Sequence, residues 1–243
     1  MRKFIDIHNH ILPGVDDGAR DIEMTIQMLR TAKQQEIEQI IATPHYNPQR
    51  RQVSQTEIRQ AYDQVCTLIQ EKVPGIQLHL GNEVFYSYSV AEGLEKGEIL
   101  TLAGSDYVLV EFRPDTDFRT IQQALSGIQM AGYLPIIAHM ERYAAILKDF
   151  SLAEELHEMG VYIQVNASSV TGNNGWKVKH YIARLMKYDL LDFIATDAHS
   201  DGRRAPHLKE TVQYLDKKMG TEYTDRILYD NPTKIITNEY IRS

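Results

Sequence analysis

The sequence predicts an α/β barrel, because short apolar runs alternate with amphipathic stretches about seven times along the chain. Segments such as YVLVEF and LPIIAH are nearly continuous in apolar residues, which is typical of parallel strands buried on both faces. No G-x-G-x-x-G follows any of these runs, so the usual dinucleotide-binding signature is missing. The number of repeats favours a closed or nearly closed barrel over an open doubly wound sheet.

Strands are expected wherever a short apolar, β-branched run stands between two amphipathic stretches. Because the connections are helical, these strands should run parallel. The expected strands are Lys3–His8, Gln39–Thr43, Ile76–Gly81, Tyr107–Phe112, Leu134–Ala138, Val161–Val165 and Asp192–Thr196.

Helix starts are marked most clearly at two places. Ser54 and Glu57 form a capping-box pattern. Apolar residues then follow at helical spacing, at Ile58, Tyr62, Val65 and Ile69. Asp21 opens a second helix, whose apolar side carries Ile22, Ile26 and Leu29.

The length of 243 residues fits one large domain that spans residues 1–243. No stretch rich in proline, glycine and serine is long enough to mark a domain boundary. The longest polar segment, Asn166–Gly175, is expected to be a loop over the active face.

Charge and hydropathy exclude several classes of protein. A formal net charge of −7 disfavours extended binding to nucleic-acid phosphates, and the local basic spot Arg50–Arg51 is interpreted as a solvated loop. Neither a signal-peptide h-region nor an apolar run of about 18 residues is found, so a cytoplasmic protein without membrane insertion is expected. Cys66 is the only cysteine, so no internal disulfide can form.

Histidines and carboxylates gather where the expected strands end. In a parallel barrel the C-terminal ends of all strands open on one face. Five of the nine histidines fall on this face, together with four carboxylates. In chain order these residues are His8, His10, Asp17, His45, Glu83, Glu111, His139, Asp197 and His199.

This set of residues predicts a metal centre. Taken singly, such a histidine is more often a satisfied polar group, and a strand-end carboxylate often caps a helix. Two pairs, His8/His10 and Asp197/His199, have i, i+2 spacing, which points both side chains the same way in extended backbone. The set contains no thiolate and is too large for one ion, so it suits two or three ions of the Mn, Fe or Zn kind. The remaining histidines, interpreted as structural or exposed, are His79, His157, His180 and His207.

The segments DIHNHILPGVDDGA, TPH, GNE, VEF, AHMERY and TDAH closely resemble the PHP (polymerase and histidinol phosphatase) superfamily. Within it, their order and spacing are similar to the bacterial capsule-type tyrosine-protein phosphatases of the CpsB/CapC/YwqE kind, over nearly the whole chain. The opening HxH alone is weakly specific, whereas HILPGVDDGA together with AHMERY is much more specific. The resemblance implies a distorted (β/α)7 TIM-like barrel of the PHP type.

The resemblance also implies a trinuclear centre, with Mn²⁺ as the expected ion and Fe or Zn as alternatives. The first ion would be held by His8, His10, Glu83 and Asp197. The second would share Glu83 and add Glu111 and His139, and the third would use Asp17, His45 and His199. Asp16 is an alternative to Asp17 that sequence chemistry alone does not separate.

Two arginines match phosphate-contacting positions of the family: Arg142 in HMERY and Arg203 in DGRRAPH. A guanidinium suits this task because its planar donors meet phosphate oxygens in pairs. A surface ion pair is the other interpretation of each, and Arg204 is an alternative to Arg203.

The position of Cys66 argues against a cysteine nucleophile. It falls in the middle of the helix that starts at Ser54, without a phosphate-cradling loop, and is interpreted as a buried structural thiol. Attack by metal-bound hydroxide is therefore expected, with Arg142 and Arg203 spreading the phosphoryl charge. The resemblance implies a phosphotyrosine substrate, on the C-terminal tail of an autophosphorylated bacterial tyrosine kinase that regulates capsule and exopolysaccharide synthesis.

Other functions stay open at this point. A histidinol-phosphate phosphatase would need a narrow pocket and a phosphopeptide tail an open face, and the loops Tyr46–Val53 and Asn166–Gly175 would set which exists. A nuclease is disfavoured by the acidic net charge. A non-catalytic interaction module would be expected to lack some ligands, and no ligand position is missing here. The sequence also leaves a homo-oligomer open.

Overall fold

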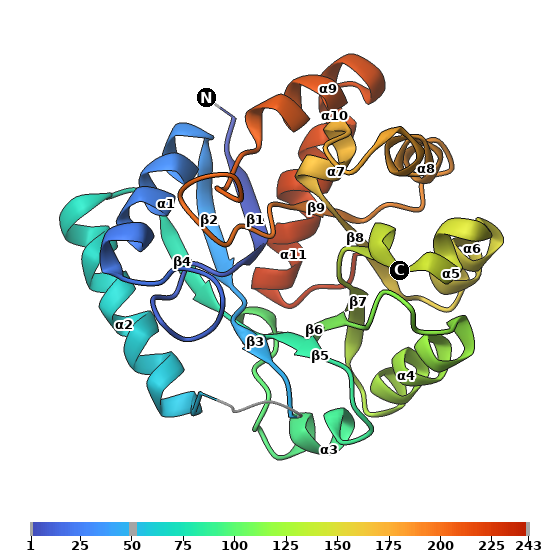
Figure 1. The fold of residues 1–243 in the computed structure, drawn as a ribbon, viewed down its shortest axis with the longest axis horizontal. Coiled ribbons are helices and arrows are strands. Elements are labelled where there is room, and N and C mark those ends of the chain that lie inside the picture. Colours follow the sequence, from blue (N-terminus) through green and yellow to red (C-terminus); the bar gives the residue numbers. More distant parts are fainter. Residues whose placement is uncertain (1, 49–52, 242–243) are drawn as a thin grey trace.

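Parallel strands curl around the centre of the molecule, and helices cover the outside (Figure 1). The structure is a computed structural model that describes residues 2–48 and 53–241, so Arg50 and Arg51 lie outside the described residues. One sheet has the order β1-β2-β4 and the other has the order β3-β5-β6-β7-β8-β9. Every strand pairing within these two sheets is parallel, which confirms the α/β class with parallel strands.

All the expected strands are present, with ends within two residues of the predicted ones. The strands are β1 (Phe4–Asn9), β2 (Ile37–Ala42), β3 (His45–Tyr46), β4 (Gln77–Leu80), β5 (Glu83–Phe85), β6 (Tyr107–Glu111), β7 (Leu134–Ile137), β8 (Tyr162–Asn166) and β9 (Phe193–Ala195).

The short strands β3 and β5 were not expected from the sequence. Each continues the direction of the strand before it after a break of two residues, and His45 of β3 pairs with Glu83 of β5. Pro44 lies in the first break, where it has no N–H to donate, and its carbonyl accepts hydrogen bonds from Asn82 Nδ2 and Glu83 N. The prediction that Glu83 follows a strand was therefore incomplete, because Glu83 begins a strand of its own.

The last strand returns to the first. Asp197 N donates to His8 O and His10 N donates to Ala198 O, both at 2.9 Å. The buried carboxylate of Asp6 joins the same two segments. It accepts a hydrogen bond from the backbone N–H of Thr196 at 2.9 Å, although the two residues are 190 positions apart in the sequence. The segments after β1 and after β9, which carry four of the predicted ligands, are therefore neighbours.

Helices connect the strands on the outside of the sheet. The helices are α1 (Ile22–Gln34), α2 (Gln55–Lys72), α3 (Val90–Glu95), α4 (Phe118–Met130), α5 (Ala144–Lys148), α6 (Ser151–Glu158), α7 (Ala167–Thr171), α8 (Trp176–Lys187), α9 (Lys209–Met219), α10 (Thr221–Asp225) and α11 (Asn231–Thr237).

The two predicted helix starts are confirmed. Asp21 caps α1 by accepting a hydrogen bond from Met24 N, and Ser54 and Glu57 form the capping box of α2. One prediction was wrong: Asn166–Gly175 is not a loop throughout, because its first half forms α7. This turn forms because its serines and alanine tolerate a helix and Gly172, at φ 106°, ends it.

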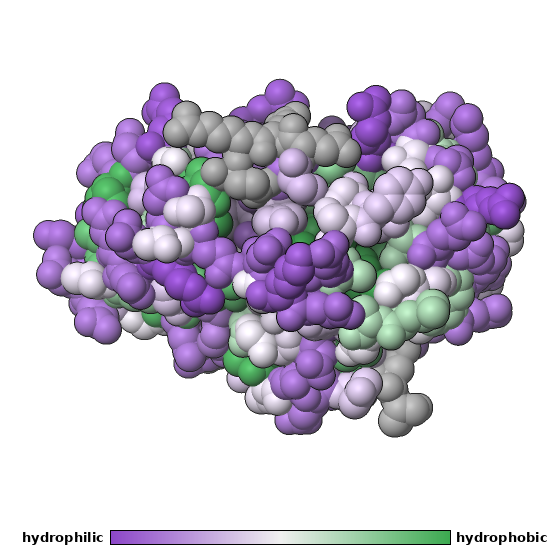
Figure 2. All heavy atoms as spheres, turned by 90° about the horizontal axis from the view of Figure 1, so that it is seen from below, coloured by the Kyte–Doolittle hydropathy of each residue, from purple (hydrophilic) through white to green (hydrophobic). Residues whose placement is uncertain are grey.

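The core lies between the sheet and these helices. On α2 the residues Ile58, Val65 and Ile69 are buried, as their spacing predicted, while Tyr62 and Cys66 are only partly buried. The interpretation of Cys66 as a buried structural thiol was therefore wrong in its burial, because the residue is only partly buried against the core. Figure 2 shows a face of the molecule that is mostly hydrophilic, with small and separate hydrophobic areas. Within the described residues no helix is long and apolar enough to cross a membrane.

Candidate metal centre

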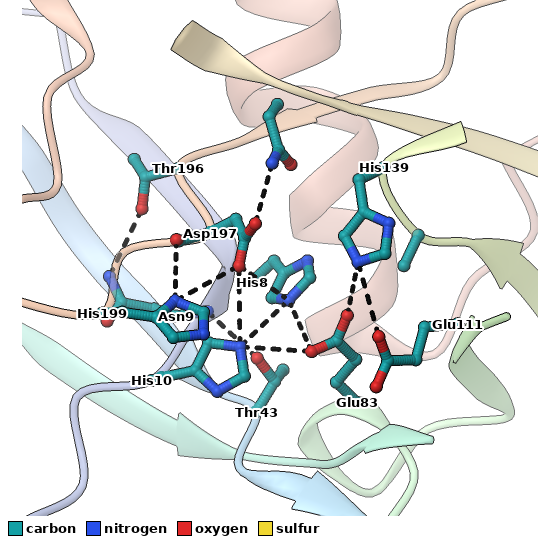
Figure 3. A network of polar contacts seen from close by, with 12 residues as sticks. His8, Asn9, His10, Thr43, Glu83, Glu111, His139, Thr196, Asp197 and His199 are labelled. Atoms are coloured by element: carbon teal, nitrogen blue, oxygen red, sulfur yellow. Dashed lines mark hydrogen bonds and ion pairs between the residues drawn. The ribbon is translucent and has the colours of Figure 1, made fainter. Parts of the chain in front are cut away.

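The nine predicted ligand residues come together at the C-terminal ends of the strands, and Figure 3 shows most of them converging on one point. His8 lies on β1, His45 on β3 and Glu83 on β5, while Glu111 ends β6. The others follow strands: His10 and Asp17 come after β1, His139 after β7, and Asp197 and His199 after β9.

The imidazoles of His8 and His10 face each other across Glu83. Their Nε2 atoms are 3.2 Å apart, and each lies 3.2 Å from Glu83 Oε2. Asp197 Oδ1 completes this group at 3.6 Å from His8 Nε2 and 3.7 Å from His10 Nε2. All four side chains are buried.

The hydrogen bonds of the Nδ1 atoms of His8 and His10 indicate that this group of side chains binds a cation. His8 Nδ1 lies 3.3 Å from the carbonyl oxygen of the Gln164 side chain, and His10 Nδ1 lies 2.7 Å from Asp16 Oδ2. Both outer partners are acceptors, so each Nδ1 carries a proton and each Nε2 of a neutral ring presents a lone pair. Two lone pairs and a carboxylate that converge in a buried site require a positive charge among them.

A second group lies around Glu111. His45 Nδ1 is 3.0 Å from Glu83 Oε2 and 3.1 Å from Glu111 Oε1, and His139 Nε2 is 2.7 Å from Glu83 Oε1. Although they are close, His45 Nδ1 and Glu83 Oε2 are buried and make no hydrogen bond with any described residue. Buried polar atoms are rarely left in this state, and a divalent cation between them would satisfy both.

The third group contains Asp17, His45, His199 and His10. Asp17 Oδ1 lies 3.3 Å from His45 Nε2 and 3.5 Å from His199 Nε2. His199 Nδ1 lies 3.0 Å from the Asp197 carbonyl oxygen, so its proton is on Nδ1 and Nε2 is free to bind a metal.

The two neighbouring aspartates of the DDG motif have different environments. The side chain of Asp16 is buried, and its carboxylate accepts from His10 Nδ1 and from the backbone N–H of His45 at 3.2 Å. The side chain of Asp17 is 69% exposed and points its oxygen at His45 and His199. Asp17 is therefore placed as a ligand would be, and Asp16 is placed to orient His10.

The grouping differs in several respects from the ligand sets that the resemblance implied, and one is that His10 also belongs to the third group. His45 lies beside both Glu83 and Glu111 as well as beside Asp17, so it stands between two groups. His139 is close to Glu83, whereas its Nε2 is 3.8 Å from Glu111 Oε2.

The carboxylates at this site stabilise positive charge on the imidazoles around them. Burial lowers the pKa of His10, but the carboxylates of Asp16 and Glu83 outweigh burial and raise it to about 10. Burial raises the pKa of Glu83, but His8 and the other imidazoles around it bring it well below its ordinary value. The carboxylates therefore stay ionised, and protons take the place of cations in the metal-free chain.

Backbone strain is found at two of the predicted ligands. His139 has φ 34° and Asp197 has φ 51°, in the left-handed region that side chains other than glycine rarely adopt. Asp197 therefore lacks the extended backbone that was expected from its spacing to His199, although Asp197 Oδ1 and His199 Nδ1 still lie 3.3 Å apart. Such strain is typical of functional sites.

Two arginines approach Asp197 from one side. Arg142 forms an ion pair with Asp197 Oδ2, and Arg204 Nη2 lies 3.2 Å from Asp197 Oδ1. Arg203 is exposed and lies on the wall of a hollow of about 540 Å³ that Arg142 and Arg204 also line. The structure therefore places Arg142 and Arg204 against Asp197, while Arg203 lines the hollow beside them.

Several residues at the site were missed by sequence reasoning. Gln164 contacts His8 and accepts a hydrogen bond from His139 N, and Asn166 Nδ2 donates to Asp197 Oδ2 at 2.8 Å. His207, interpreted as structural or exposed, is exposed and lines the same hollow as the arginines. The signal that pointed to Gln164 and Asn166 was available, because two amides in a fully buried strand need partners.

Comparison with known proteins identifies the family. A model of the family described as capsular polysaccharide synthesis, CpsB/CapC, matches residues 4–237. The chain belongs to the CpsB/CapC family.

Curated members of the CpsB/CapC family are similar to the chain over almost its full length. Tyrosine-protein phosphatase YwqE of Bacillus subtilis is 37% identical over 240 residues, which cover 98% of this chain and 93% of the relative. Tyrosine-protein phosphatase CpsB of Streptococcus pneumoniae is 33% identical over 242 residues, which cover 98% of this chain and all of the relative.

Solved structures give the same result for the fold. One comes from work on YwqE from Bacillus subtilis and CpsB from Streptococcus pneumoniae, described as unique metal-dependent tyrosine phosphatases; it matches with a TM-score of 0.92 at 35% identity and covers 98% of this chain and 96% of the other. The phosphotriesterase homology protein of Escherichia coli matches with a TM-score of 0.61 at 13% identity, covering 96% of this chain and 98% of the other. This second likeness concerns the fold alone.

Proposed function

We propose that this member of the CpsB/CapC family is a metal-dependent protein-tyrosine phosphatase, a hydrolase of phosphoric monoesters. The relatives that carry this name supply the substrate class. The observation that supports metal dependence best is a pair of buried atoms, His45 Nδ1 and Glu83 Oε2, that face each other without a hydrogen bond to any described residue. They lie beside the facing nitrogens of His8 and His10.

The donor set fits divalent cations. Imidazole nitrogens and carboxylates without a thiolate suit Mn²⁺, Fe²⁺ or Zn²⁺, and the three groups of ligand atoms would hold three ions, with Mn²⁺ as the proposed one. Bound cations would supply a Lewis acid and lower the pKa of a coordinated water toward about 7. The ligands would be His8, His10, Asp17, His45, Glu83, Glu111, His139, Asp197 and His199.

The arginines of the chain bind and orient the phosphoryl group in this proposal. Arg142 and Arg204 flank Asp197 at the edge of the hollow, where planar guanidinium donors can meet phosphate oxygens in pairs. Arg203, on the wall of the same hollow, would meet the substrate farther from the metal centre. Cys66 lies on α2, and burial raises the pKa of its thiol, so it has no nucleophilic role.

The phosphotyrosine is proposed to lie on a protein, and the C-terminal tail of a bacterial tyrosine kinase that regulates capsule synthesis is the proposed partner. The charge of the hollow disfavours the second candidate, histidinol phosphate, which carries a cationic amine. Its lining brings three arginines together with His207, and only Glu210 and Asp197 oppose them.

The fold is proposed to be a distorted (β/α)7 barrel of the PHP type, formed as one domain over residues 1–243. The pairs β2/β3 and β4/β5 support this count, because each pair follows one direction with a break of two residues. A cytoplasmic location stays a prediction.

A parallel assay tests the proposed function. Untagged protein is given a phosphotyrosine peptide, histidinol phosphate and single-stranded DNA, each with Mn²⁺ and with a chelator. The proposal expects Mn²⁺-dependent hydrolysis of the phosphopeptide in preference to the other two. Faster hydrolysis of histidinol phosphate would reverse the choice of substrate, and no turnover of any substrate with Mn²⁺ would favour a non-catalytic module.

A further inference from the structure

The chain contains a long stretch without acidic residues. Between Glu158 and Asp189 there is no aspartate or glutamate, although the formal net charge of the protein is −7. Helix α8 lies in this stretch, and its cationic residues are Lys177, Lys179, Arg184 and Lys187. An acidic protein thus carries one strongly basic helix.

An open groove lies between α8 and α5, which are neighbours in Figure 1. It has a volume of about 530 Å³. The ring of Trp176, which is 74% exposed, lines it together with Leu147 and Val178. The described residues that line the groove include no carboxylate, and their cations are Lys148, Lys177 and Arg184. We call this surface the α5/α8 groove.

The residues that line the α5/α8 groove follow directly in sequence after residues that line the hollow at the metal centre. Asn173 and Asn174 line the hollow beside Asp197, and residues 176–178 line the groove. Asn174 Nδ2 donates to Ser169 Oγ at 2.7 Å, and Ser169 donates to the buried Glu141 at 2.6 Å, so the segment between hollow and groove is anchored. A peptide whose phosphotyrosine sits at the metal centre could continue over this segment into the groove.

We propose that the α5/α8 groove docks an acidic segment next to the phosphotyrosine of the protein substrate, an inference that rests on the proposed phosphatase function. Charge complementarity selects this partner, because the groove is cationic although the protein as a whole carries a formal net charge of −7. Trp176 supplies the apolar anchor, since large exposed aromatic rings commonly carry much of the binding energy at interfaces.

Trp176 makes docking directly measurable, because it is the only tryptophan in the chain. The probe is a peptide with glutamates beside a non-hydrolysable difluorophosphonate analogue of phosphotyrosine, added to the Mn²⁺-loaded protein. We expect a saturable blue shift of tryptophan emission. A peptide of the same sequence with glutamine in place of glutamate should bind about tenfold more weakly, as loss of two or more charge pairs implies.

The charge of the groove is tested with the double variant Lys148→Glu/Lys177→Glu. The matched control is Lys217→Glu/Lys218→Glu on α9, which makes the same change in net charge on exposed lysines away from the groove. The groove variant should raise the Kd of the acidic peptide about tenfold at low salt, and less at high salt, while the control stays within about twofold. Hydrolysis of free phosphotyrosine should be unchanged in both.

Two results would overturn the proposal: equal Kd values for the groove variant and its control, or a tryptophan shift with phosphatidylserine vesicles and none with the acidic peptide. The second result would assign the groove to a membrane surface. Because binding is measured without turnover, a groove-dependent Kd in a protein that hydrolyses no phosphotyrosine would support docking and contradict the proposed phosphatase activity alone.

Discussion

Gly18 allows the DDG loop to approach His10 closely. A Cβ atom at this position would lie 2.1 Å from His10 O and 2.4 Å from His10 Cβ, far inside any real contact. The backbone N–H of Gly18 also donates to Asp16 Oδ1, and Asp16 in turn orients the His10 ring. The conformation of the turn at Gly18 therefore positions both His10 and Asp16.

The substitution Gly18→Ala should displace His10 and the loop that carries Asp17. We expect kcat on a phosphotyrosine peptide to fall at least about tenfold, since small displacements of reacting groups cost one to two orders of magnitude. Mn²⁺ affinity should fall as well. Gly127→Ala on α4 is the control, because nothing lies within 4 Å of the added Cβ. Retained activity and Mn²⁺ affinity in Gly18→Ala would contradict this account of the loop.

Cys66 gives a second prediction for a single residue. Replacement by serine should leave phosphatase activity largely intact, because the thiol is half-buried on α2 and burial raises its pKa. The measurement is kcat/KM on a phosphotyrosine peptide with Mn²⁺ present. A complete loss of activity in a folded Cys66→Ser protein would mean that the cysteine takes part in the reaction.

The join between β1 and β9 matters most among the elements, because it brings the first and last ligands together. Asp6 holds this join: its carboxylate accepts from Thr196 N at 2.9 Å, Thr196 Oγ1 at 2.5 Å and Asn9 Nδ2 at 2.9 Å. The burial of Asp6 raises its pKa, and the hydrogen bonds from Thr196 and Asn9 oppose that shift.

The variant Asp6→Ala removes these three acceptor contacts and leaves buried donors unpaired. We expect a loss of about 3 kcal/mol in the free energy of unfolding, since each unpaired buried donor costs about 1–3 kcal/mol and the site can partly relax. Urea unfolding of the metal-free chain measures it. The exposed Asp63 on α2 provides the control substitution Asp63→Ala, and equal stability losses in the two variants would argue against a special role for Asp6.

The strands, the two helix starts and the gathering of nine histidines and carboxylates at strand ends were predictable, because each leaves a local signal in the sequence. Apolar runs mark the strands, and the capping box at Ser54 marks α2. The strands β3 and β5 were not predictable, because two or three residues after a break show no periodicity. The contacts of Gln164 and Asn166 were missed, and the choice between Arg203 and Arg204 was left open, because these contacts depend on which segments are neighbours in space.

For the molecule as a whole, metal binding is expected to be coupled to stability. The pKa of His10 rises from 6.5 to about 10 in the metal-free fold, so between these values the folded chain binds more protons than the unfolded chain. Stability contributed by this proton is present below pH 6.5 and is lost as the pH rises through about 10. A bound cation replaces the proton and removes this dependence.

Urea unfolding at pH 7 and pH 9.5 tests this coupling. The chelated protein should lose stability at the higher pH, whereas protein saturated with Mn²⁺ should lose less, so the stabilisation by metal grows with pH. Calorimetry in buffers of different ionisation enthalpy should show proton release on Mn²⁺ binding. A metal-free protein that becomes more stable between these pH values would contradict the proposed proton occupancy of the site.

Metal-dependent hydrolysis is tested most directly on untagged protein purified without added metal. Its metal content is measured by mass spectrometry, and its hydrolysis of phosphotyrosine is measured on the same samples. The three groups of ligand atoms predict more than one divalent ion per chain, approaching three on saturation, and loss of hydrolysis in step with their removal by a chelator. Full hydrolysis by protein that contains no metal would contradict the account.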